Sequence, residues 1–435
     1  MTMLTYSKYK DSGVDWIGEI PEGWKTIMSG AIFLDSKERG ISSDEVLSST
    51  QNDGVIPKRM LESVVQNAED ADLSSFKKVR VNDGIISLRS FQGGIEFNER
   101  YEGKITPAYT VIRSRKTECI AFFKYLLKSK QYIAMLDANT SGIRQGKTIR
   151  YQDFKTIPLP YPSAIEQQAI ANYLDEKTAA IDAAMADIER SIELLNEYRQ
   201  SVISEAVTKG LDHDAPMKDS GINWIGDIPL QWTVTKIINL ATRKSGHTPD
   251  KKKEEYWQNG DIVWISLADS PALRKHHYVS ESNTMTNMEG INHSSAELLP
   301  PGTVLLSRDA SIGLTAIAAT ELAVSQHFMA YICGPKLYNE YLYYTFESMQ
   351  QELNRLSMGS TIPTIGLPLI HGLRIPVPPI EEQHEIVDCL QHKLNELDSL
   401  IAQKQSLIVR LKEYRSSLIS ECVTGKVKVP GVKED

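Results

Sequence analysis

The most constraining feature of this sequence is a long segment that occurs twice. The copies run from Glu166 to Val207 and from Glu382 to Val423, and they align end to end without a gap and without Pro or Gly. Their last parts, EYRQSVISEAVT and EYRSSLISECVT, are identical at nine of twelve positions. Both segments are therefore predicted to be long helices of equal length, each with an apolar face that must be buried.

Apolar residues recur at heptad spacing in both copies, which is typical of a coiled coil. One helix cannot bury such a seam alone, so we expect the two copies to pair as one two-helix coiled coil. The alternative is two amphipathic helices that pack on separate domains. The seam residues expected to form this spacer are Leu174, Ile181, Ile188 and Leu195 in the first copy and Leu390, Leu397, Lys404 and Leu411 in the second.

A second repeat precedes each globular part of the chain. The segment from Asp11 to Trp24 returns as Asp219 to Trp232, with nine of fourteen positions identical. Its Gly and Pro residues predict a turn-rich cap, and its tryptophans are expected to anchor the cap in a core. The order cap, globule, helix thus occurs twice and predicts internal two-fold pseudosymmetry. If the axis is perpendicular to the helices, they run antiparallel and the globules lie at opposite ends of the spacer.

The two globular parts, about 25–156 and 233–373, have the mixed pattern of an α+β fold with two α/β domains. Each contains a buried strand that ends in an arginine, Arg89 or Arg308, then short helices near 120–130 and 340–356. Each has a loop rich in Gly, Ser and Thr, 141–148 or 358–364, and leaves through an extended proline strand. We divide the chain into a first cap and globule (1–157), a first spacer helix (158–214), a second cap and globule (215–374) and a second spacer helix with its tail (375–435).

Charge is distributed unevenly along a chain whose formal net charge is −8. Residues 25–157 carry 21 basic and 16 acidic side chains, whereas residues 163–214 carry 4 basic and 11 acidic side chains. The acidity is concentrated in the first helical segment, which would repel DNA phosphates, while the first globule is mildly basic. The four scattered cysteines, the absence of an apolar signal region and the absence of an apolar run of about 18 residues predict a cytoplasmic protein without a membrane segment.

No pattern of catalytic residues or metal ligands stands out in the sequence. Residues 142–148, GIRQGKT, are one residue short of a phosphate-binding loop, and a proline strand follows where a helix is required. Zinc-ligand spacings, a nucleophile elbow and a dinucleotide-binding fingerprint are all missing. Arg144, Gln145 and Lys147 suit contacts with guanine edges, adenine edges and phosphate better than they suit a nucleotide. We therefore expect no enzyme and no metal site in this chain.

Several strings together identify a family. In the second globule these are Gly246-His-Thr-Pro249, Tyr256-Trp257, Gly260-Asp-Ile-Val-Trp-Ile265 with Asp269, and Ser307-Arg-Asp-Ala-Ser-Ile-Gly313. With the doubled cap, the Ile-Pro-x-Pro entry into each helix and the doubled Glu-Tyr-Arg-x-Ser-x-Ile-Ser-Glu, they resemble the specificity subunit of type I restriction-modification systems. The resemblance covers essentially the whole chain, although the first globule lacks the Gly-x-Thr-Pro and Tyr-Trp strings.

The resemblance implies two target recognition domains that each bind one half of a bipartite double-stranded DNA site. The helices would set the gap and dock two modification (methyltransferase) subunits, and restriction (translocase/nuclease) subunits would join the complex. S-adenosylmethionine, ATP and Mg²⁺ would then be bound by the partner subunits, with no cofactor in this chain. The residues that we expect to contact DNA are Arg89, Arg144, Gln145 and Lys147 in the first globule and Lys244, His247, Thr248, Arg308, Ser311, Ser360, Thr361 and Thr364 in the second.

A different class of function is compatible with the same organisation. A coiled-coil adaptor could hold two protein-binding domains without touching DNA, and the negative net charge favours that alternative. The loops that carry arginine and amide side chains in both globules favour DNA binding. Binding of DNA that weakens with salt would distinguish the two functions.

Overall fold

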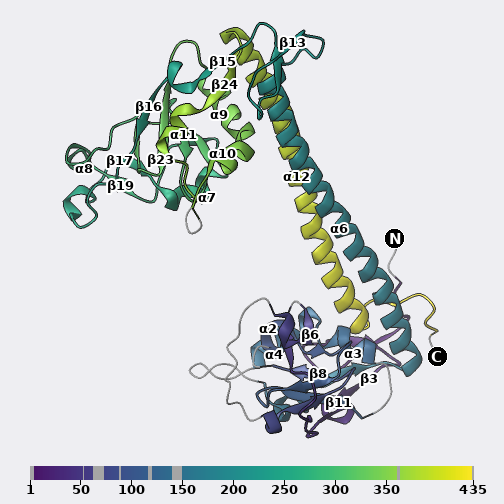
Figure 1. Cartoon of the computed structure of the whole chain (residues 1–435). Coiled ribbons are helices and arrows are strands. Elements are labelled where there is room, and N and C mark those ends of the chain that lie inside the picture. The colour runs from purple at the N-terminus through teal and green to yellow at the C-terminus, as the bar shows by residue number, and fades with distance from the viewer. Residues whose placement is uncertain are drawn as a thin grey trace. The chain divides into compact units, whose positions relative to one another are not determined.

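The computed structural model describes residues 4–51, 53–61, 73–87, 90–115, 120–139, 149–359 and 363–433. The chain forms two compact units (Figure 1). Unit 1 comprises Met1–Ile188 and Gln405–Asp435, and unit 2 comprises Glu189–Lys404. Each unit therefore contains one cap, one globular head and a part of both long helices.

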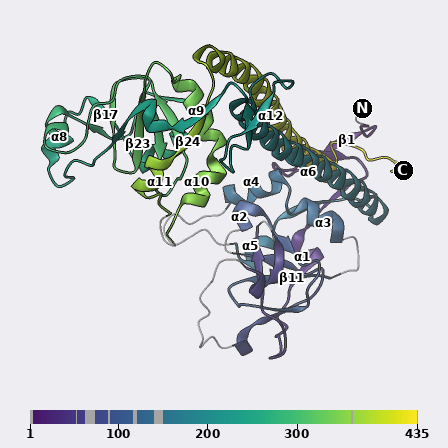
Figure 2. The same cartoon turned by 45° about the horizontal axis from the view of Figure 1, so that its top comes forward.

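The two predicted helices are present as α6 (Ala164–Lys209) and α12 (Ile380–Val423). They lie side by side in both views (Figures 1 and 2). In unit 1 the core joins Leu174 and Ile181 of α6 to Leu418 of α12, and in unit 2 it joins Ile203 of α6 to Leu390 of α12. The prediction of a paired seam is confirmed, because every predicted seam position is buried or half-buried, including Lys404.

Ion pairs define the direction of the helix pair in each unit. In unit 1, Arg415 Nε and Nη2 donate to the two carboxylate oxygens of Asp182 at 2.9 and 3.1 Å. In unit 2, Arg199 Nε lies 3.3 Å from Asp398 Oδ1. The sequence repeat aligns Asp182 with Asp398 and Arg199 with Arg415, so the two pairs are copies of one interaction between antiparallel helices. The predicted internal pseudosymmetry therefore extends to individual side chains.

The two caps have the same structure. β1 (Tyr9–Asp11) pairs antiparallel with β2 (Glu19–Pro21), and β13 (Met217–Asp219) pairs antiparallel with β14 (Asp227–Pro229). Trp24 and Trp232 are buried, as predicted. The glycine after each long helix, Gly425 or Gly210, has φ of +73° or +78° and packs against the tryptophan of the cap in its own unit. Glycine favours this left-handed conformation at a helix end because it has no Cβ.

The main sheets of the two heads share a strand order that could not be read from the sequence. In the first head the order is β4-β11-β8-β9, and in the second it is β16-β23-β20-β21-β18. The strands of these sheets are β4 (Phe33–Asp35), β8 (Gly84–Ile86), β9 (Glu96–Phe97), β11 (Thr110–Ser114), β16 (Ala241–Ser245), β18 (Tyr278–Val279), β20 (Val304–Ser307), β21 (Thr315–Ala318) and β23 (Phe328–Cys333). The predicted α+β fold with two related α/β heads is confirmed.

Smaller strands extend each head. The proline exit strands are β12 (Pro158–Tyr161) and β24 (Arg374–Val377), and they pair with β3 (Lys25–Met28) and β15 (Thr233–Lys236), respectively. These pairs connect the strand after each cap with the strand before each long helix. The remaining strands are β5 (Leu47–Thr50), β6 (Gly54–Pro57), β7 (Lys77–Val79), β10 (Gly103–Ile105), β17 (Ile262–Ile265), β19 (Met285–Thr286) and β22 (Leu322–Val324).

Short helices follow the central strands of each head, but they are divided differently from the prediction. The helix expected near 340–356 is two helices, and the one expected near 120–130 ends earlier and is followed by another. The helices of the heads are α1 (Ser29–Ile32), α2 (Ser90–Gly93), α3 (Ile120–Leu126), α4 (Lys130–Asn139), α5 (Tyr151–Phe154), α7 (Ser270–Leu273), α8 (Met288–Asn292), α9 (Asn339–Ser348), α10 (Gln350–Leu356) and α11 (Leu367–Gly372).

Each head is fixed to the long helices of its unit. In unit 2 the buried Tyr341 of α9 donates its hydroxyl hydrogen bond to Val207 O of α6 at 2.9 Å. In unit 1 Tyr125 of α3 donates to Asp175 of α6 at 2.7 Å. Head residues and helix residues also belong to one hydrophobic core in each unit. A head and its helix segments are thus expected to move together. None of the helices in the described ranges is long and apolar enough to cross a membrane.

Candidate nucleic-acid interface

The second head gathers polar loops at one edge of its main sheet. β23 lies between β16 and β20 and runs antiparallel to both, with Ser245 opposite Met329 and Ser307 opposite Phe328. The ends of β16 and β20 therefore meet the beginning of β23. The loops that follow β16 and β20 carry half of the eight DNA contacts predicted for this head, namely His247, Thr248, Arg308 and Ser311. We call this surface the polar edge, and its members are Thr248, Arg308, Asp309, Gln326, His327 and Thr364.

Hydrogen bonds connect the loops of the polar edge. Thr248 Oγ1 donates to Gln326 Oε1 at 2.5 Å. Arg308 Nη1 donates to Ile365 O at 3.2 Å, and its Nε lies 3.4 Å from Gln326 O. Thr364 forms an isolated bridge with Asp309. The structure thus brings together three of the predicted residues, Thr248, Arg308 and Thr364, from segments that are far apart in the sequence.

Three residues of the polar edge, Asp309, Gln326 and His327, were not among those predicted from the sequence. His327 Nδ1 lies 2.8 Å from Asp309 Oδ2, and the Asp309 carboxylate is buried. Gln326 is exposed beside His327. No local pattern marks His327 as functional. The signal that identifies them is the pairing of β23 with β20, which places residues 325–327 against residues 308–309.

The other predicted residues of the second head are more scattered. Lys244 donates to Glu297 at 2.6 Å, so its charge is compensated within the head. His247 is exposed, while its backbone N–H donates to Val324 O at 3.1 Å. Ser311 accepts a long hydrogen bond of 3.4 Å from Arg274, which adds a cation beside the polar edge. Ser360 and Thr361 lie outside the described residues.

The contacts predicted for the first head cannot be placed beside those of the second. All four residues, Arg89, Arg144, Gln145 and Lys147, lie outside the described residues. Their expected role in DNA binding therefore stays a prediction.

The register of the described strands nevertheless corrects one pairing made from the sequence. β8 begins with Gly84 opposite Ile112 of β11, and β20 begins with Val304 opposite Tyr331 of β23. In this register Gly84 is equivalent to Val304 and Ile85 to Leu305, whereas the match made from the sequence pairs Ile85 with Val304. The described strands thus differ by one position from the match made from the sequence, and Arg89 itself lies outside the described residues.

The packing of the two strands supports this register. Ile86 and Leu306 belong to the cores that include the long helices, whereas Ile85 and Leu305 belong to separate, smaller cores. The match made from the sequence would pair Ile85 with Val304, which faces the core of the long helices. Successive residues of a strand face opposite sides of the sheet, so a shift of one residue exchanges the two faces.

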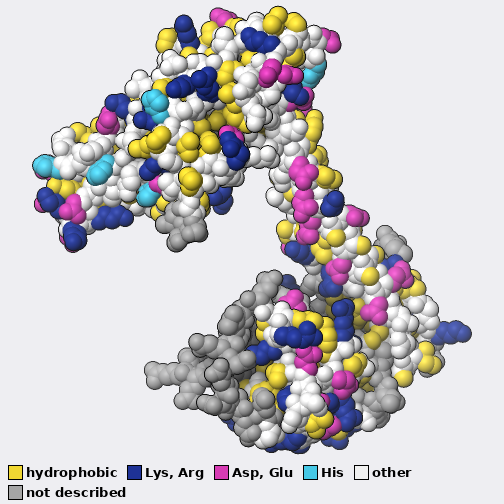
Figure 3. Space-filling view, in the orientation of Figure 1, with side chains coloured by type: hydrophobic (Ala, Val, Ile, Leu, Met, Phe, Trp, Pro, Cys, Tyr) yellow, Lys and Arg dark blue, Asp and Glu magenta, His cyan; other side chains and the backbone are white. Residues whose placement is uncertain are grey.

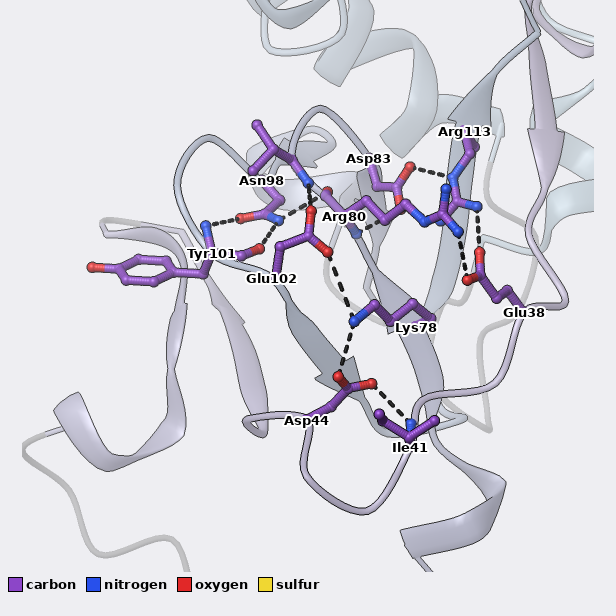
Figure 4. Close-up of polar contacts among 11 residues, drawn as sticks. Glu38, Ile41, Asp44, Lys78, Arg80, Asp83, Asn98, Tyr101, Glu102 and Arg113 are labelled. Carbon is purple, nitrogen blue, oxygen red and sulfur yellow. Dashed lines mark hydrogen bonds and ion pairs between the residues drawn. The ribbon is translucent and has the colours of Figure 1, made fainter.

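Three basic side chains of the first head, Arg113, Arg80 and Lys78, are held in a network of ion pairs that was not predicted from the sequence (Figure 4). Arg113 donates from Nε and Nη2 to the buried Asp83 at 2.8 and 2.7 Å, and from Nη1 to Glu38 at 2.7 Å. Arg80 donates to Glu38 at 2.7 Å as well. Lys78 lies between Asp44 and Glu102. These side chains point toward one another, so their positive charges stabilise the head and are not free to neutralise phosphate.

The same network changes the acidity of its carboxyl groups. Hydrogen bonds from Arg113 and Arg80 hold the pKa of Glu38 below its usual value. A hydrogen bond from Lys78 lowers the pKa of Asp44 in the same way. Both carboxylates are therefore charged partners at neutral pH. The basic surplus counted in residues 25–157 overstates the positive charge that the described part of this head can offer to DNA.

The long helices present acidic side chains to solvent, and several are visible along them in Figure 3. The visible face of unit 2 carries Lys, Arg and His side chains over the head. Among the described residues, no group of three or more His, Cys, Asp or Glu side chains is arranged to hold a metal ion. The arrangement favours recognition by the heads, with the helices as a frame that phosphates would avoid.

Comparison with known proteins finds a matching family model and similar relatives. The model of the type I restriction modification DNA specificity domain matches residues 229–410. The type I restriction enzyme MjaIX specificity subunit of Methanocaldococcus jannaschii is 36% identical over 183 residues, which are 42% of this chain and 41% of the relative. The MjaVIII specificity subunit of the same organism is 24% identical over 431 residues, with 94% of each chain covered.

A solved structure has the same fold. It is a chain from a structural study of complex assembly and conformational transition in the type I R-M system. Its TM-score is 0.69 at 16% sequence identity, with 93% of this chain and 98% of that chain covered. The family model covers the second head and part of α12, and the longer alignment extends over 94% of the chain. Residues 229–410 therefore match the type I restriction modification DNA specificity domain, and the chain as a whole is similar to specificity subunits of type I restriction enzymes.

Proposed function

We propose that this chain is the DNA-recognition subunit of a type I restriction-modification enzyme. Each head would bind one half of a bipartite target, and the paired helices would set the gap between the half-sites. The observation that carries this proposal is the doubled unit: two heads with a common sheet order, each fused through a continuous core to an antiparallel helix pair. Divergent loops on a repeated frame are what recognition of two different half-sites requires.

The proposal includes a division of labour between subunits. This chain would be non-catalytic and would act in the cytoplasm. Two modification subunits would supply S-adenosylmethionine and methylate adenines, and restriction subunits would supply the chemistry that depends on ATP and Mg²⁺. The polar edge of the second head supports this division, because its side chains are hydrogen-bonded to one another as a recognition surface and carry no nucleophile with an adjacent base.

A map of adenine methylation tests the function. Cells that contain this chain and its modification subunit are compared with cells that lack only this chain. We expect a bipartite motif with a fixed gap that is present only when this chain is present. If the purified complex assembles but no such motif is methylated, the proposal is wrong, and an adaptor that binds proteins through its two heads becomes the better explanation.

The helices also offer a surface for the modification subunits. The predicted seam residues are buried or half-buried between the helices and act as the spacer, so a partner must bind elsewhere on them. Tyr198 and Tyr414 have large, partly apolar side chains, and yet 58% and 47% of their surface is exposed to solvent. They occupy the same position in the two copies of the repeat. Leu194 and Leu400 are also exposed in unit 2, as Leu407 is in unit 1. Two equivalent apolar sites fit two copies of one partner.

We therefore expect Tyr198→Ala or Tyr414→Ala to reduce the number of bound modification subunits from two to one at limiting concentration. The double substitution should remove both, because a buried tyrosine at an interface contributes about 2 kcal/mol or more, which is roughly a 30-fold change in Kd. Mass measurement of the complex gives the stoichiometry directly.

Glu189→Ala with Gln405→Ala is the matched control, since these residues are also exposed on the helices and also occupy one position of the repeat. The control should keep both partners. Unchanged affinity in the double tyrosine variant would show that the partners bind another surface.

A further inference from the structure

We propose that Gln326 and His327 are base-reading side chains of the second head, and that Thr248 and Asp309 are positioning residues that orient them. This inference rests on the proposed function and deepens it, because it names the atoms that would select bases in one half-site. It also reassigns Thr248 and Arg308, which the sequence had suggested as direct contacts.

The position of the pair is fixed by the backbone. Gln326 and His327 lie between β22 and β23, at the edge where three neighbouring strands begin or end. Ser325 before them is buried and its N–H donates to Ile265 O at 2.8 Å. Phe328 after them is also buried, and its N–H donates to Ser325 O at 3.1 Å. A tightly held turn therefore displays two polar side chains on its outer side.

The amide of Gln326 is oriented by a neighbour. Thr248 donates its hydroxyl hydrogen to Gln326 Oε1 at 2.5 Å. The amide oxygen keeps a second lone pair, and the amide nitrogen keeps hydrogens to donate. A glutamine oriented in this way presents an acceptor and a donor side by side, which matches the donor and acceptor on the major-groove edge of adenine.

The imidazole of His327 is oriented in the same manner. Asp309 Oδ2 lies 2.8 Å from Nδ1, so the carboxylate accepts the Nδ1 hydrogen, and in the neutral form of the imidazole Nε2 is then an acceptor. Nε2 lies 3.5 Å from Gln326 Nε2, which places the two readers side by side. His327 is 35% exposed, whereas Asp309 is buried and its Oδ1 has no hydrogen-bond partner in the described part of the chain. The acceptor Nε2 would select the exocyclic amine of adenine or cytosine.

Arg308 also helps to hold the turn that carries Gln326 and His327, and we assign it to positioning and not to contact with a base. Its guanidinium donates to Ile365 O, and its Nε lies 3.4 Å from Gln326 O. It also lies 3.7 Å from the Asp309 carboxylate. The arginine therefore holds the backbone of the displayed turn and compensates the charge of the buried acid. Two of its N–H donors are used in this way and its side chain is only 19% exposed, which limits what it can offer to guanine.

The experiment uses the complete complex with its modification subunits and a DNA library randomised at both half-sites. Methylated products are sequenced to give the base preference at every position. We expect Gln326→Ala and His327→Ala each to relax the preference at one or two positions of a single half-site, by about 10- to 100-fold. The other half-site should keep its preference. Thr248→Val and Asp309→Asn should relax the same positions by smaller factors, which a purely structural role would not produce.

Glu321→Gln is the matched control, because Glu321 is exposed at the opposite end of β22. It should leave both half-sites unchanged. A uniform loss of methylation across all sequences in the reader variants, or no change in preference, would overturn the assignment of Gln326 and His327. Failure of the wild-type complex to select any bipartite site would overturn the proposed function as well, so the two failures are distinguishable.

Discussion

Removal of one heptad from each long helix is expected to move methylation to sites whose gap is about three base pairs shorter. Seven helical residues span about 10 Å, and double-stranded DNA rises about 3.4 Å per base pair. The deletions remove residues 186–192 of α6 and residues 402–408 of α12. Asp182 of α6 pairs with Arg415 of α12, and Arg199 of α6 pairs with Asp398 of α12, so each deleted segment lies between the two ion pairs. Both ion pairs and the heptad phase are then kept, so the helices can still pair.

The half-sites themselves should not change, because both heads remain intact. Sequencing of methylated DNA from a library with variable gaps measures the new spacing and both half-sites together. Deletion of one heptad from only one helix is the control, and it should impair assembly because the two seams no longer match. An unchanged gap in the double deletion would mean that helix length does not set the spacing.

The parts of the fold that could be predicted from the sequence are those with a local, repeated pattern. The long helices followed from heptad spacing and from a gap-free repeat that also relates the two ion pairs. The caps and the proline strands followed from turn residues at fixed positions. In each case the evidence lies within one segment or in its direct repeat.

The common sheet of the two heads could not be predicted, because strand order depends on contacts between distant segments. β8 and β20 have few identical residues, yet each lies in the same place between its neighbours. The difference of one residue between the sequence match and the register of β8 and β20 has the same cause: a shift of one residue in a strand is invisible in an alignment by eye but is fixed by the partner strand.

The polar edge shows the same limit for function. Residue type and the neighbouring glycine indicated Thr248 and Arg308 correctly as members of a polar surface. Their hydrogen bonds, however, are made to Gln326 and to Ile365, which are 78 and 57 residues away in the sequence. From its residue type and neighbours alone, a residue that contacts a ligand cannot be told from a residue that orients another side chain. The contacts between distant segments are what the proposed assignment of readers and positioning residues rests on.

Gly246→Ala is expected to abolish recognition of one half-site while the other is retained. A Cβ at Gly246 would lie 2.0 Å from Val324 O and 2.4 Å from Ser325 O, and neither backbone atom can rotate away. The loop must shift, which costs about 1 to 3 kcal/mol for overpacking and about 1 kcal/mol more if the hydrogen bond from His247 N to Val324 O is lost. Such a shift also separates Thr248 from Gln326, whose hydrogen bond depends on this close approach.

The Gly246→Ala variant should therefore show a lower Tm and, at temperatures where it is still folded, at least a roughly tenfold loss of preference in one half-site. Sequencing of methylated products from the randomised library measures the preference. Gly372→Ala is the control because a Cβ there meets no atom within 4 Å, and it should preserve both half-sites. If Gly246→Ala kept the full preference of the wild type, the contact between this loop and the turn that carries Gln326 would have no part in recognition.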